Sequence, residues 1–303
     1  MTDSPIDHRT DPLTRAQSVV VPSRQKRPNL PNSGCPFCPG GLEAPEGTYD
    51  VKWFPNRWPA MPENRCEMVL YTPDHDRAFW QLSVSEARKV VDLWAERTRT
   101  LGERDDVAYV LVFENRGPDV GATIAHPHGQ IYAYGEVPPQ PLRELVDGVL
   151  EVPAAGDELI VASHGPWVGW VPRAATWPYE LLLADAAGHG ALCDEGLDRD
   201  GLALLLIDVL ARLDQVAEGE MPYMMWVHQR PTNGEAFATQ PVHVHIAPLL
   251  RSPGTPRFVA AAELGSHLYF NPVDPSAAAA ELRDQPGPPD SPNRNGQSAE
   301  DHA

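Results

Sequence analysis

The sequence has few of the features that mark membrane, secreted or nucleic-acid-binding proteins. No apolar run approaches the roughly 18 residues of a membrane-spanning helix, so no membrane span is expected. The four cysteines in 303 residues form no regular disulfide framework, which is typical of a reducing compartment. The N-terminus "MTDSPIDHRTDPLTRAQ" is polar and lacks the apolar core of a signal peptide. These absences predict a soluble, cytoplasmic protein.

Positive charge is also scarce, because 24 Lys and Arg stand against 42 Asp and Glu, for a formal net charge of -18. Without a basic stripe the chain is not expected to bind nucleic acid. One compact basic cluster, "SRQKRP", contains Arg24, Lys26 and Arg27. Such a cluster suits a phosphate group, and a solvated N-terminal arm is the alternative interpretation.

What the chain does contain is enough apolar sequence for one large domain or two of ordinary size, with 42% hydrophobic residues. Residues 1–17 and 284–303 are expected to be a disordered arm and tail. The tail "DQPGPPDSPNRNGQSAEDHA" carries almost no apolar side chains, so it cannot bury a core. The ordered part is therefore expected between residues 18 and 283.

Strands and helices alternate in this ordered part. Ser83 and Glu86 form a capping box that predicts a helix continuing to residue 102. A second helix, mostly buried, is predicted at 199–218 and a short third one at 274–284. Runs rich in β-branched and aromatic residues predict strands at 109–115, 131–135, 158–163, 167–172, 179–185, 223–229 and 242–250.

The two halves of the ordered part resemble each other. "VKWFPNRWPAM" around Trp53 resembles "VGWVPRAATWPYE" around Trp170, and "AHPHGQIY" at His126 resembles "PVHVHIAP" at His243. Both pairs are 117 residues apart, and "FENRG" and "VHQRP" add a looser third match. These repeated motifs predict an α+β fold made of two duplicated half-domains, residues 18–140 and 141–283, each with a helix-covered antiparallel sheet.

The stretch "ATIAHPHGQIYAY" is the strongest candidate for a catalytic motif. Strand alternation would place His126, His128 and Gln130 on one face, and Pro127 restricts the segment to the start or edge of a strand. A neutral imidazole at His128 can attack phosphorus and form a covalent intermediate. Gln130 can donate a hydrogen bond to a phosphoryl oxygen but cannot act as a general acid. The pattern therefore favours transfer over hydrolysis.

"CPFC" is the first candidate metal motif. A redox pair would open a helix after a buried strand, whereas Cys35 and Cys38 lie in the turn-rich "PNSGCPFCPGG". This context favours zinc, for which His75 and His126 are candidate further ligands. An exposed loop position without a metal is the alternative for His75.

A second metal motif lies near the C-terminal end of the chain. His243 and His245 alternate on one predicted strand and His228 ends the preceding strand, so three imidazoles meet at one sheet edge. An acidic fourth ligand is expected, and Glu144 is the candidate. Hydrogen-bonded core histidines without a metal remain the alternative.

Together these motifs resemble those of the galactose-1-phosphate uridylyltransferase family, a duplicated branch of the histidine triad superfamily. "HPHGQ" is the most specific of them, since histidine triad hydrolases carry a histidine where Gln130 stands. "SRQKRP", "CPFC", "TPDH", "FENRG", "VHQRPTNGE" and "HVHIAPLLRS" occur in the family's order. The resemblance extends from residue 18 to 283.

The resemblance implies a role for each matching residue. His128 would become uridylylated and Gln130 would stabilise that intermediate. Cys35, Cys38, His75 and His126 would bind Zn²⁺, and the second site, which holds Fe²⁺ or Zn²⁺ in the family, would be formed by Glu144, His228, His243 and His245. The implied uridine nucleotide contacts are Arg24, Arg27, Asn56, Asn115, Gly121, Thr123 and Gln130.

The segment implied to bind the sugar phosphate departs from the family pattern. "PRFVAAAELGS" offers Arg257, Phe258 and Glu263, with arginine where the family usually has lysine. Ala262 removes a contact on the hexose side, and a downstream glutamine of the family has no clear counterpart. The range of accepted hexose 1-phosphates is therefore left open.

The main hypothesis is an enzyme that moves UMP from UDP-glucose to galactose 1-phosphate, giving UDP-galactose and glucose 1-phosphate, as a homodimer with active sites between subunits. The first alternative is a related nucleotidyltransferase or phosphorylase that acts on another nucleotide sugar or on a dinucleotide. The second alternative is a noncatalytic zinc-binding module, which would leave His128 without a purpose.

Overall fold

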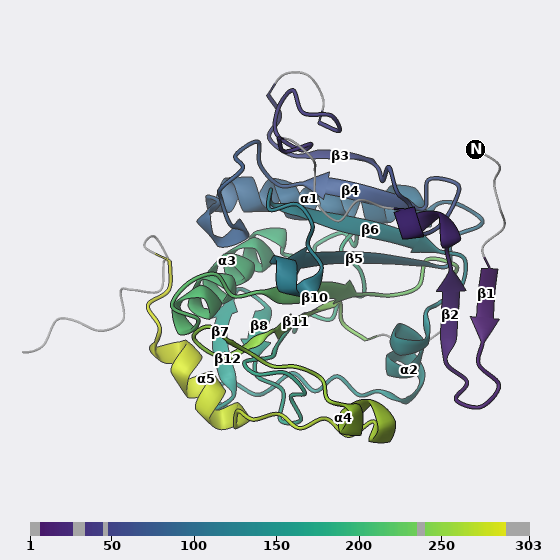
Figure 1. Cartoon of the computed structure of the whole chain (residues 1–303). Coiled ribbons are helices and arrows are strands. Elements are labelled where there is room, and N and C mark those ends of the chain that lie inside the picture. Colours follow the sequence, from purple (N-terminus) through teal and green to yellow (C-terminus); the bar gives the residue numbers. More distant parts are fainter. Residues whose placement is uncertain (1–6, 27–33, 45–47, 235–239, 289–303) are drawn as a thin grey trace, which may run out of the picture.

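The computed structural model describes residues 7–26, 34–44, 48–234 and 240–288 (Figure 1). Arg27 and the terminal residues 1–6 and 289–303 lie outside the described residues. Within the expected disordered arm, Asp7–Thr10 (β1) pairs with Gln17–Val20 (β2) in an antiparallel hairpin, which differs from the expectation. Pro22–Lys26 (η1) follows the hairpin as a 3₁₀ helix.

One nine-stranded sheet, antiparallel at every pairing, extends through both halves of the chain, in the order β3-β4-β6-β5-β10-β11-β9-β8-β7. The strands of the N-terminal half are Lys52–Pro55 (β3), Cys66–Leu70 (β4), Tyr109–Arg116 (β5) and His128–Tyr134 (β6). Those of the C-terminal half are Ile160–His164 (β7), Trp167–Trp170 (β8), Leu181–Asp185 (β9), Tyr223–His228 (β10) and His243–Pro248 (β11).

The sheet confirms the predicted duplication and α+β class. Each half places a helix between an earlier group of strands and a final pair. The first half runs β3, β4, helix Val84–Gly102 (α1), β5, β6, and the second runs β7, β8, β9, helix Arg199–Val216 (α3), β10, β11, with one strand more. The halves join where β5 pairs with β10, and the strand order is reversed on either side of that pairing. The two half-sheets therefore form one continuous sheet instead of two separate ones.

The register of the duplication differs from the expected one. β6 begins at His128 and β11 begins at His243, a separation of 115 residues. His243 thus corresponds to His128, and the predicted equivalence with His126 at 117 residues is wrong. His126 lies two residues before β6, in a bend, so it is not part of the strand that carries His128 and Gln130, whereas the sequence predicted all three on one strand. Pro127 ends the strand there because it has no N–H to donate to the ladder.

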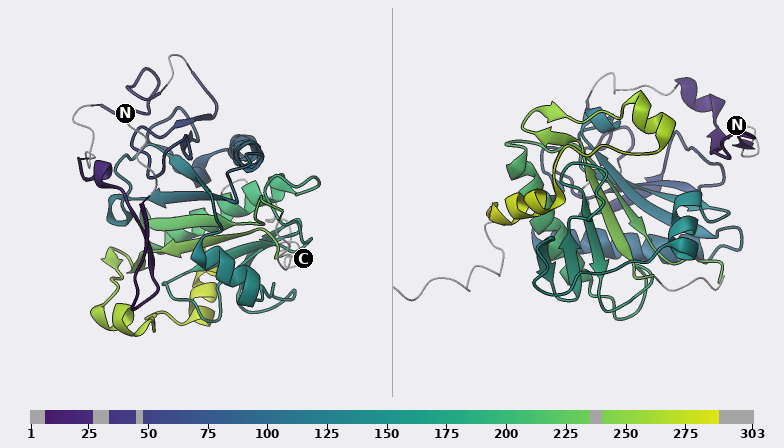
Figure 2. Two further views of the ribbon diagram at one scale, coloured as in Figure 1. Left: turned by 90° about the vertical axis from the view of Figure 1, so that its right-hand side faces the viewer. Right: turned by 90° about the horizontal axis from the view of Figure 1, so that it is seen from below.

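Helices α1 and α3 cover one face of the sheet, and the main core lies between them and the strands (Figure 2). The capping box is confirmed: Ser83 Oγ accepts from Glu86 N at 3.3 Å and Ser83 N donates to the Glu86 carboxylate at 2.7 Å. Buried residues of β6 and β11, such as Ile131 and Val244, pack against the helices. The alternating residues, including Gln130 and His245, therefore point to the opposite face.

Shorter elements complete the described chain. They are the 3₁₀ helices Phe79–Gln81 (η2) and Pro118–Val120 (η3), the strands Leu250–Ser252 (β12) and Thr255–Pro256 (β13), and the helices Pro139–Asp147 (α2), Ala261–Ser266 (α4) and Pro275–Asp284 (α5). α5 confirms the third predicted helix. Among the helices of the described ranges, none combines the length and apolar character needed to cross a membrane.

Strands β3 and β4 were not predicted from the sequence. Every residue of β4 is buried, including Glu67, so the strand shows no alternation between polar and apolar positions. The Glu67 carboxylate is buried because Arg97 of α1 forms a two-pronged ion pair with it, at 2.7 and 2.9 Å. A buried charge of this kind is tolerated only with its partner, which the local sequence does not reveal.

Candidate active site and metal centres

Four predicted zinc ligands from three separate segments meet beside the start of β6. Their ligand atoms, from Cys35, Cys38, His75 and His126, all lie within 4.8 Å of one another. Cys38 Sγ is 3.5 Å from His75 Nδ1 and 3.7 Å from His126 Nδ1. Tetrahedral zinc, with Zn–S of about 2.3 Å and Zn–N of about 2.0–2.1 Å, requires sulfur–nitrogen separations of about 3.6 Å. The four side chains therefore fit zinc.

The hydrogen bonds of His126 prepare its ring for a metal. His126 is fully buried, and its Nε2–H donates to the Thr72 carbonyl oxygen at 2.8 Å. The proton is then on Nε2, which leaves the Nδ1 lone pair facing Cys38. Burial lowers the pKa of His126, which keeps the ring neutral. Tyr49 lies against this arrangement, with its hydroxyl donating to the Phe37 carbonyl at 2.9 Å and 3.2 Å from His126 Nε2.

His128 is oriented through the same backbone. Its Nδ1–H donates to the carbonyl oxygen of His126 at 2.7 Å, so the lone pair of the neutral ring is on Nε2. The edge of Phe37 packs against the His128 ring with centroids 5.1 Å apart. His128 lines a cavity of about 750 Å³, together with Asn115 and Thr123. The His128 ring is thus held in place at the wall of a cavity large enough for a nucleotide.

Gly129 is explained by its neighbour Tyr71, a buried residue just after β4. A Cβ atom on Gly129 would lie 2.2 Å from the Tyr71 hydroxyl oxygen. Only glycine leaves room for this side chain behind the strand that carries His128 and Gln130. Tyr71 is fully buried, and its role could not be read from the sequence.

Gln130 lies on the same face of β6 as His128. It is registered with Met68 of β4 and Phe113 of β5. Asn56 Nδ2 donates to Gln130 Oε1 over 3.5 Å, a long hydrogen bond, and Asn56 Oδ1 accepts from Trp58 N at 2.8 Å. Because Gln130 Oε1 faces Asn56, the amide nitrogen of Gln130 points away from Asn56.

The second predicted metal cluster is also assembled. The ligand atoms of Glu144 on α2, His228 at the end of β10, and His243 and His245 on β11 lie within 4.8 Å of one another. Glu144 Oε2 is 2.6 Å from His228 Nδ1 and 3.3 Å from His243 Nε2. Glu144 Oε1 is 4.0 Å from His245 Nε2, which is buried and has no hydrogen-bond partner among the described residues.

The electrostatics of this cluster suit a cation. Burial opposes ionisation of Glu144, but hydrogen bonds from His228 and His243 hold the pKa of its carboxyl well below the ordinary value. Burial lowers the pKa of His228, and burial together with the neighbouring His228 and His243 lowers that of His245 to about 3. One carboxylate and three imidazoles, with an unsatisfied buried nitrogen among them, are the donor set expected for Fe²⁺ or Zn²⁺.

The predicted nucleotide contacts are only partly brought together. Asn115 and Thr123 line the cavity beside His128, and Gly121 lies in the same loop with a φ of 87°. Arg24 lies in η1, near Cys66 at the far end of β4 from His128 (Figure 1). Asn56 is at this same end, since its N–H donates to the Cys66 carbonyl at 2.8 Å, so Arg24 lies near Asn56 and away from His128.

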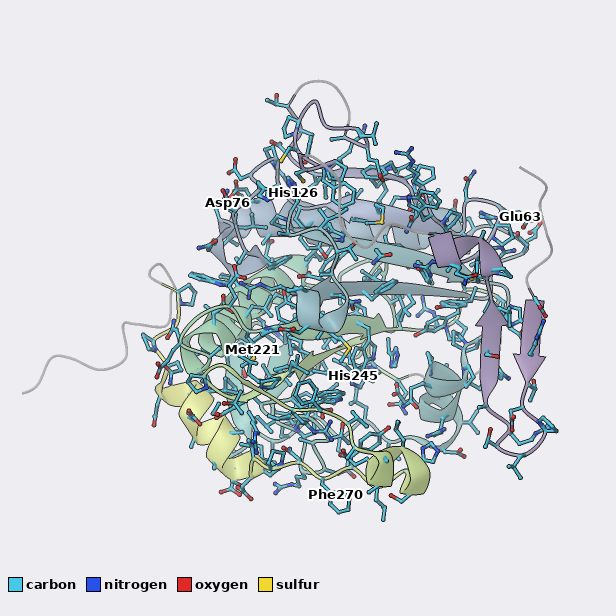
Figure 3. The ribbon with its side chains drawn as sticks, viewed as in Figure 1. Glu63, Asp76, His126, Met221, His245 and Phe270 are labelled. Carbon is cyan, nitrogen blue, oxygen red and sulfur yellow. The ribbon has the colours of Figure 1, made fainter. Side chains whose placement is uncertain are left out.

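The predicted sugar-phosphate residues lie away from His128 within the chain. Figure 3 shows Phe270, which follows α4, at the bottom of the view and His126 near the top. Arg257 and Glu263 are buried and form an ion pair with each other, and the Arg257 guanidinium lies 4.6 Å above the Trp177 ring. Phe258 by contrast is 77% exposed. The buried Arg257 and Glu263 thus hold this segment in place, while apolar side chains such as Phe258 are exposed to solvent.

One further buried acid in the cavity wall was not predicted as a site residue. Glu114 of "FENRG" accepts from the Tyr223 hydroxyl at 2.7 Å, and its second oxygen has no hydrogen-bond partner among the described residues. Burial raises the pKa of Glu114 to about 7. The motif was visible in the sequence, but only burial in the fold makes the carboxyl unusual.

Comparisons with known proteins agree with this geometry. Residues 55–138 match the family described as galactose-1-phosphate uridyl transferase, N-terminal domain, and residues 142–267 match the corresponding C-terminal domain. The galactose-1-phosphate uridylyltransferase of Thermotoga maritima is 33% identical, covering 91% of this chain and 97% of that protein. The Streptomyces lividans protein of the same name is 34% identical, covering 91% and 86%.

Solved structures share the fold. A uridylyltransferase structure superposes with a TM-score of 0.79 at 28% identity, covering 91% of this chain and 97% of that one. An ADP-glucose phosphorylase from Arabidopsis thaliana superposes with a TM-score of 0.72 over 92% of this chain and 99% of that one. At 22% identity the second likeness concerns the fold alone.

Proposed function

Because the chain belongs to the galactose-1-phosphate uridylyltransferase family, we propose that it transfers UMP from UDP-glucose to galactose 1-phosphate through a covalent uridylyl-His128 intermediate. The observation that carries the proposal is the hydrogen bond from His128 Nδ1 to the His126 carbonyl at 2.7 Å. It makes Nε2 the nucleophilic atom at the cavity wall. The reaction is that of a nucleotidyltransferase in galactose metabolism.

The exchange takes place in two displacements. His128 Nε2 attacks the α-phosphorus of UDP-glucose, a nitrogen–phosphorus bond forms, and the bond from that phosphorus to the bridging oxygen breaks. Glucose 1-phosphate leaves with the electron pair. A phosphate oxygen of galactose 1-phosphate then attacks the same phosphorus, the bond to Nε2 breaks, and UDP-galactose leaves. Neither leaving group needs a proton, because a phosphate oxygen is stable as an anion at neutral pH.

Gln130 stabilises the charge that builds on the phosphoryl oxygens during both displacements. Its amide nitrogen faces away from Asn56, so it can donate to a non-bridging oxygen. It offers no acidic proton to a departing group and no base for water. Asn115 and Thr123, on the cavity wall, contact the nucleotide.

The proposed enzyme binds two metal ions. Cys35, Cys38, His75 and His126 hold Zn²⁺, and Glu144, His228, His243 and His245 hold Fe²⁺ or Zn²⁺. When bound, these metals cross-link loops to the sheet and fix ligand orientation. Replacement of Cys38 by Ser should lower zinc content and thermal stability together. Metal analysis that finds no zinc in the parent protein would contradict the first site.

We also propose a homodimer in which each active site takes the exposed segment after β13 from the partner. That segment exposes apolar side chains that a single chain leaves uncovered, namely Phe258 at 77%, Leu264 at 65%, Leu268 at 66%, Tyr269 at 44% and Phe270 at 66%. Exposure on this scale is typical of an interface. Arg257, Phe258 and Glu263 are proposed to act on the hexose phosphate from this position.

The decisive experiment is incubation with UDP-glucose alone, followed by intact-mass measurement. We expect an adduct of the mass of UMP on the parent protein and none on His128→Ala. A parallel incubation with ADP-glucose tests the alternative of a related phosphorylase or nucleotidyltransferase. An adduct with ADP-glucose and none with UDP-glucose would overturn the uridylyl assignment.

A mixing experiment tests the shared active site. His128→Ala and Phe258→Asp should each be inactive alone, because one lacks the nucleophile and the other lacks a contact supplied to the partner. Coexpression should restore up to about a quarter of the parent activity, since a mixed dimer has one intact site and mixed dimers form half of the population. No recovery from a mixture that does form mixed dimers would place both residues in the same subunit's site.

A further inference from the structure

Trp226 is a residue of β10 to which neither the motifs nor the proposed reaction assigns a role. Its strand neighbours Met225 and Val227 are buried in the main core, so Trp226 points to the opposite face, the face that carries the second metal cluster. In register it lies directly between Phe113 of β5 and His245 of β11. Figure 3 labels His245 near the middle of the view.

The indole of Trp226 lies flat on the imidazole of His245. The two ring centroids are 5.0 Å apart and the ring planes differ by 10°. The Trp226 ring is only tilted against His228, at 6.3 Å and 55°. Parallel stacking fixes the plane of a ring but leaves its nitrogens available, because it makes no hydrogen bond.

The three imidazoles of the cluster are held by different means. His228 is held by its hydrogen bond to Glu144 at 2.6 Å, and His243 by its Nδ1–H bond to the Pro241 carbonyl at 2.8 Å. His245 Nε2 has no hydrogen-bond partner among the described residues, although it is buried. Histidine ligands are usually oriented by a hydrogen bond from the nitrogen that does not bind the metal. Neither ring nitrogen of His245 has such a bond among the described residues. The rings of His228 and His243 meet it at steep angles, with centroids 4.9 and 5.0 Å away, and only the Trp226 indole, among the described rings, is stacked parallel to its face.

We propose that Trp226 is a positioning residue of the Glu144–His228–His243–His245 metal centre, and that its indole reports whether this centre is occupied. The inference rests on the second metal site of the proposed function. By fixing the plane of His245, Trp226 keeps Nε2 directed at the point shared with Glu144 and the other two imidazoles. An ion at that point lies next to the imidazole on which the indole is stacked.

The test uses Co²⁺ titration of the full-length, metal-depleted protein. Co²⁺ at the cysteine site gives intense thiolate charge-transfer absorption, whereas Co²⁺ bound by Glu144 and three histidines gives only weaker d–d bands, so the two sites are resolved. Tryptophan emission is recorded in the same titration. In the parent protein, filling of the second site should quench part of the emission.

Two substitutions of Trp226 distinguish its effect on metal affinity from its fluorescence response to the bound metal. Trp226→Phe keeps a flat ring over His245, so we expect Co²⁺ affinity within a few-fold of the parent but loss of the second-site quenching. Trp226→Leu fills the space without a ring and should weaken second-site binding by about 10- to 100-fold, as loss of a ligand's supporting contact does. Binding at the cysteine site should be unchanged in both.

The controls are Trp58→Phe, which removes a partly exposed indole in the loop after β3, and Met224→Leu, which alters packing on the same face of β10. Both should keep the quenching and the affinity of the parent. Parent affinity in Trp226→Leu, or undiminished quenching in Trp226→Phe, would overturn the inference. So would a parent protein with no second-site binding, whereas the UMP adduct on His128 tests the proposed reaction independently of these results.

Discussion

His128 and His243 occupy the same position in the two halves of the fold and hold their rings in the same way. Each is the first residue of its strand, β6 or β11. Each Nδ1–H donates to the carbonyl oxygen two residues earlier, at 2.7 Å to His126 and 2.8 Å to Pro241. In both rings Nδ1 is thus used, and Nε2 is the second ring nitrogen. His128 lines a cavity, whereas His243 Nε2 lies 3.3 Å from Glu144 Oε2 in the second metal cluster.

The first prediction distinguishes the proposed nucleophile His128 from the proposed metal ligand His243. His128→Ala should abolish uridylyl exchange while both metals remain bound, because His128 is in neither ligand set. His243→Ala should lose the second metal while zinc remains. Metal content by mass spectrometry and exchange assays on the same preparations measure both effects. Exchange above a few per cent in His128→Ala would remove this residue as the nucleophile.

The second prediction concerns the glycine between His128 and Gln130. Gly129→Ala should destabilise the protein by about 1–3 kcal/mol and slow exchange, because the added methyl group overlaps the Tyr71 hydroxyl. Tyr71→Phe removes that oxygen, and the double variant Gly129→Ala/Tyr71→Phe should recover part of both losses. Thermal unfolding and exchange rates measure the recovery. A double variant no better than Gly129→Ala would show that the overlap with Tyr71 is not the cause.

The third prediction concerns the hydrogen bond from Asn56 to Gln130. Gln130→Ala should slow the exchange by about 10²–10³-fold, the usual loss for one transition-state donor. Asn56→Ala should also slow it, because the Gln130 amide loses the contact that sets its orientation. If Asn56 acts through Gln130, the double variant should be no slower than Gln130→Ala alone. Losses that multiply would instead indicate a direct contact from Asn56 to the nucleotide.

The fourth prediction uses the raised pKa of Glu114. Burial raises it from an ordinary 4.5 to about 7, so the folded state holds a proton that the unfolded state has lost between these pH values. Stability should therefore fall as pH rises from 4.5 to 7, by up to about 3 kcal/mol from this group. Glu114→Gln, which can still accept from Tyr223, removes that loss.

Glu114→Gln should thus unfold at a higher temperature than the parent at pH 8, and the difference should shrink as pH falls toward 4.5. Unfolding followed by circular dichroism over that range measures the difference. Glu114→Asp serves as a control that keeps the carboxyl. A difference between Glu114→Gln and the parent that does not change with pH would show that folding does not raise the pKa of Glu114.

Local patterns in the sequence were sufficient for much of the fold. The Ser83–Glu86 capping box and the helix that follows depend on neighbours within four residues, and they are confirmed. The duplication was also visible, because both halves keep similar short motifs. β4 was missed because Glu67 breaks its apolar pattern, and only Arg97, thirty residues later on α1, makes the buried charge acceptable.

The site shows the same division. Residue types predicted the two metal clusters, because cysteine and histidine at short spacings have few other uses, and the fold brings each set within 4.8 Å. The sequence could not show that Arg257, which is predicted to bind phosphate, is buried and held by Glu263 and Trp177. Nor could it show that His243 corresponds to His128, because that equivalence depends on strand register. Register, burial and contacts between distant segments arise only when the chain packs, and these decided how each predicted residue is held.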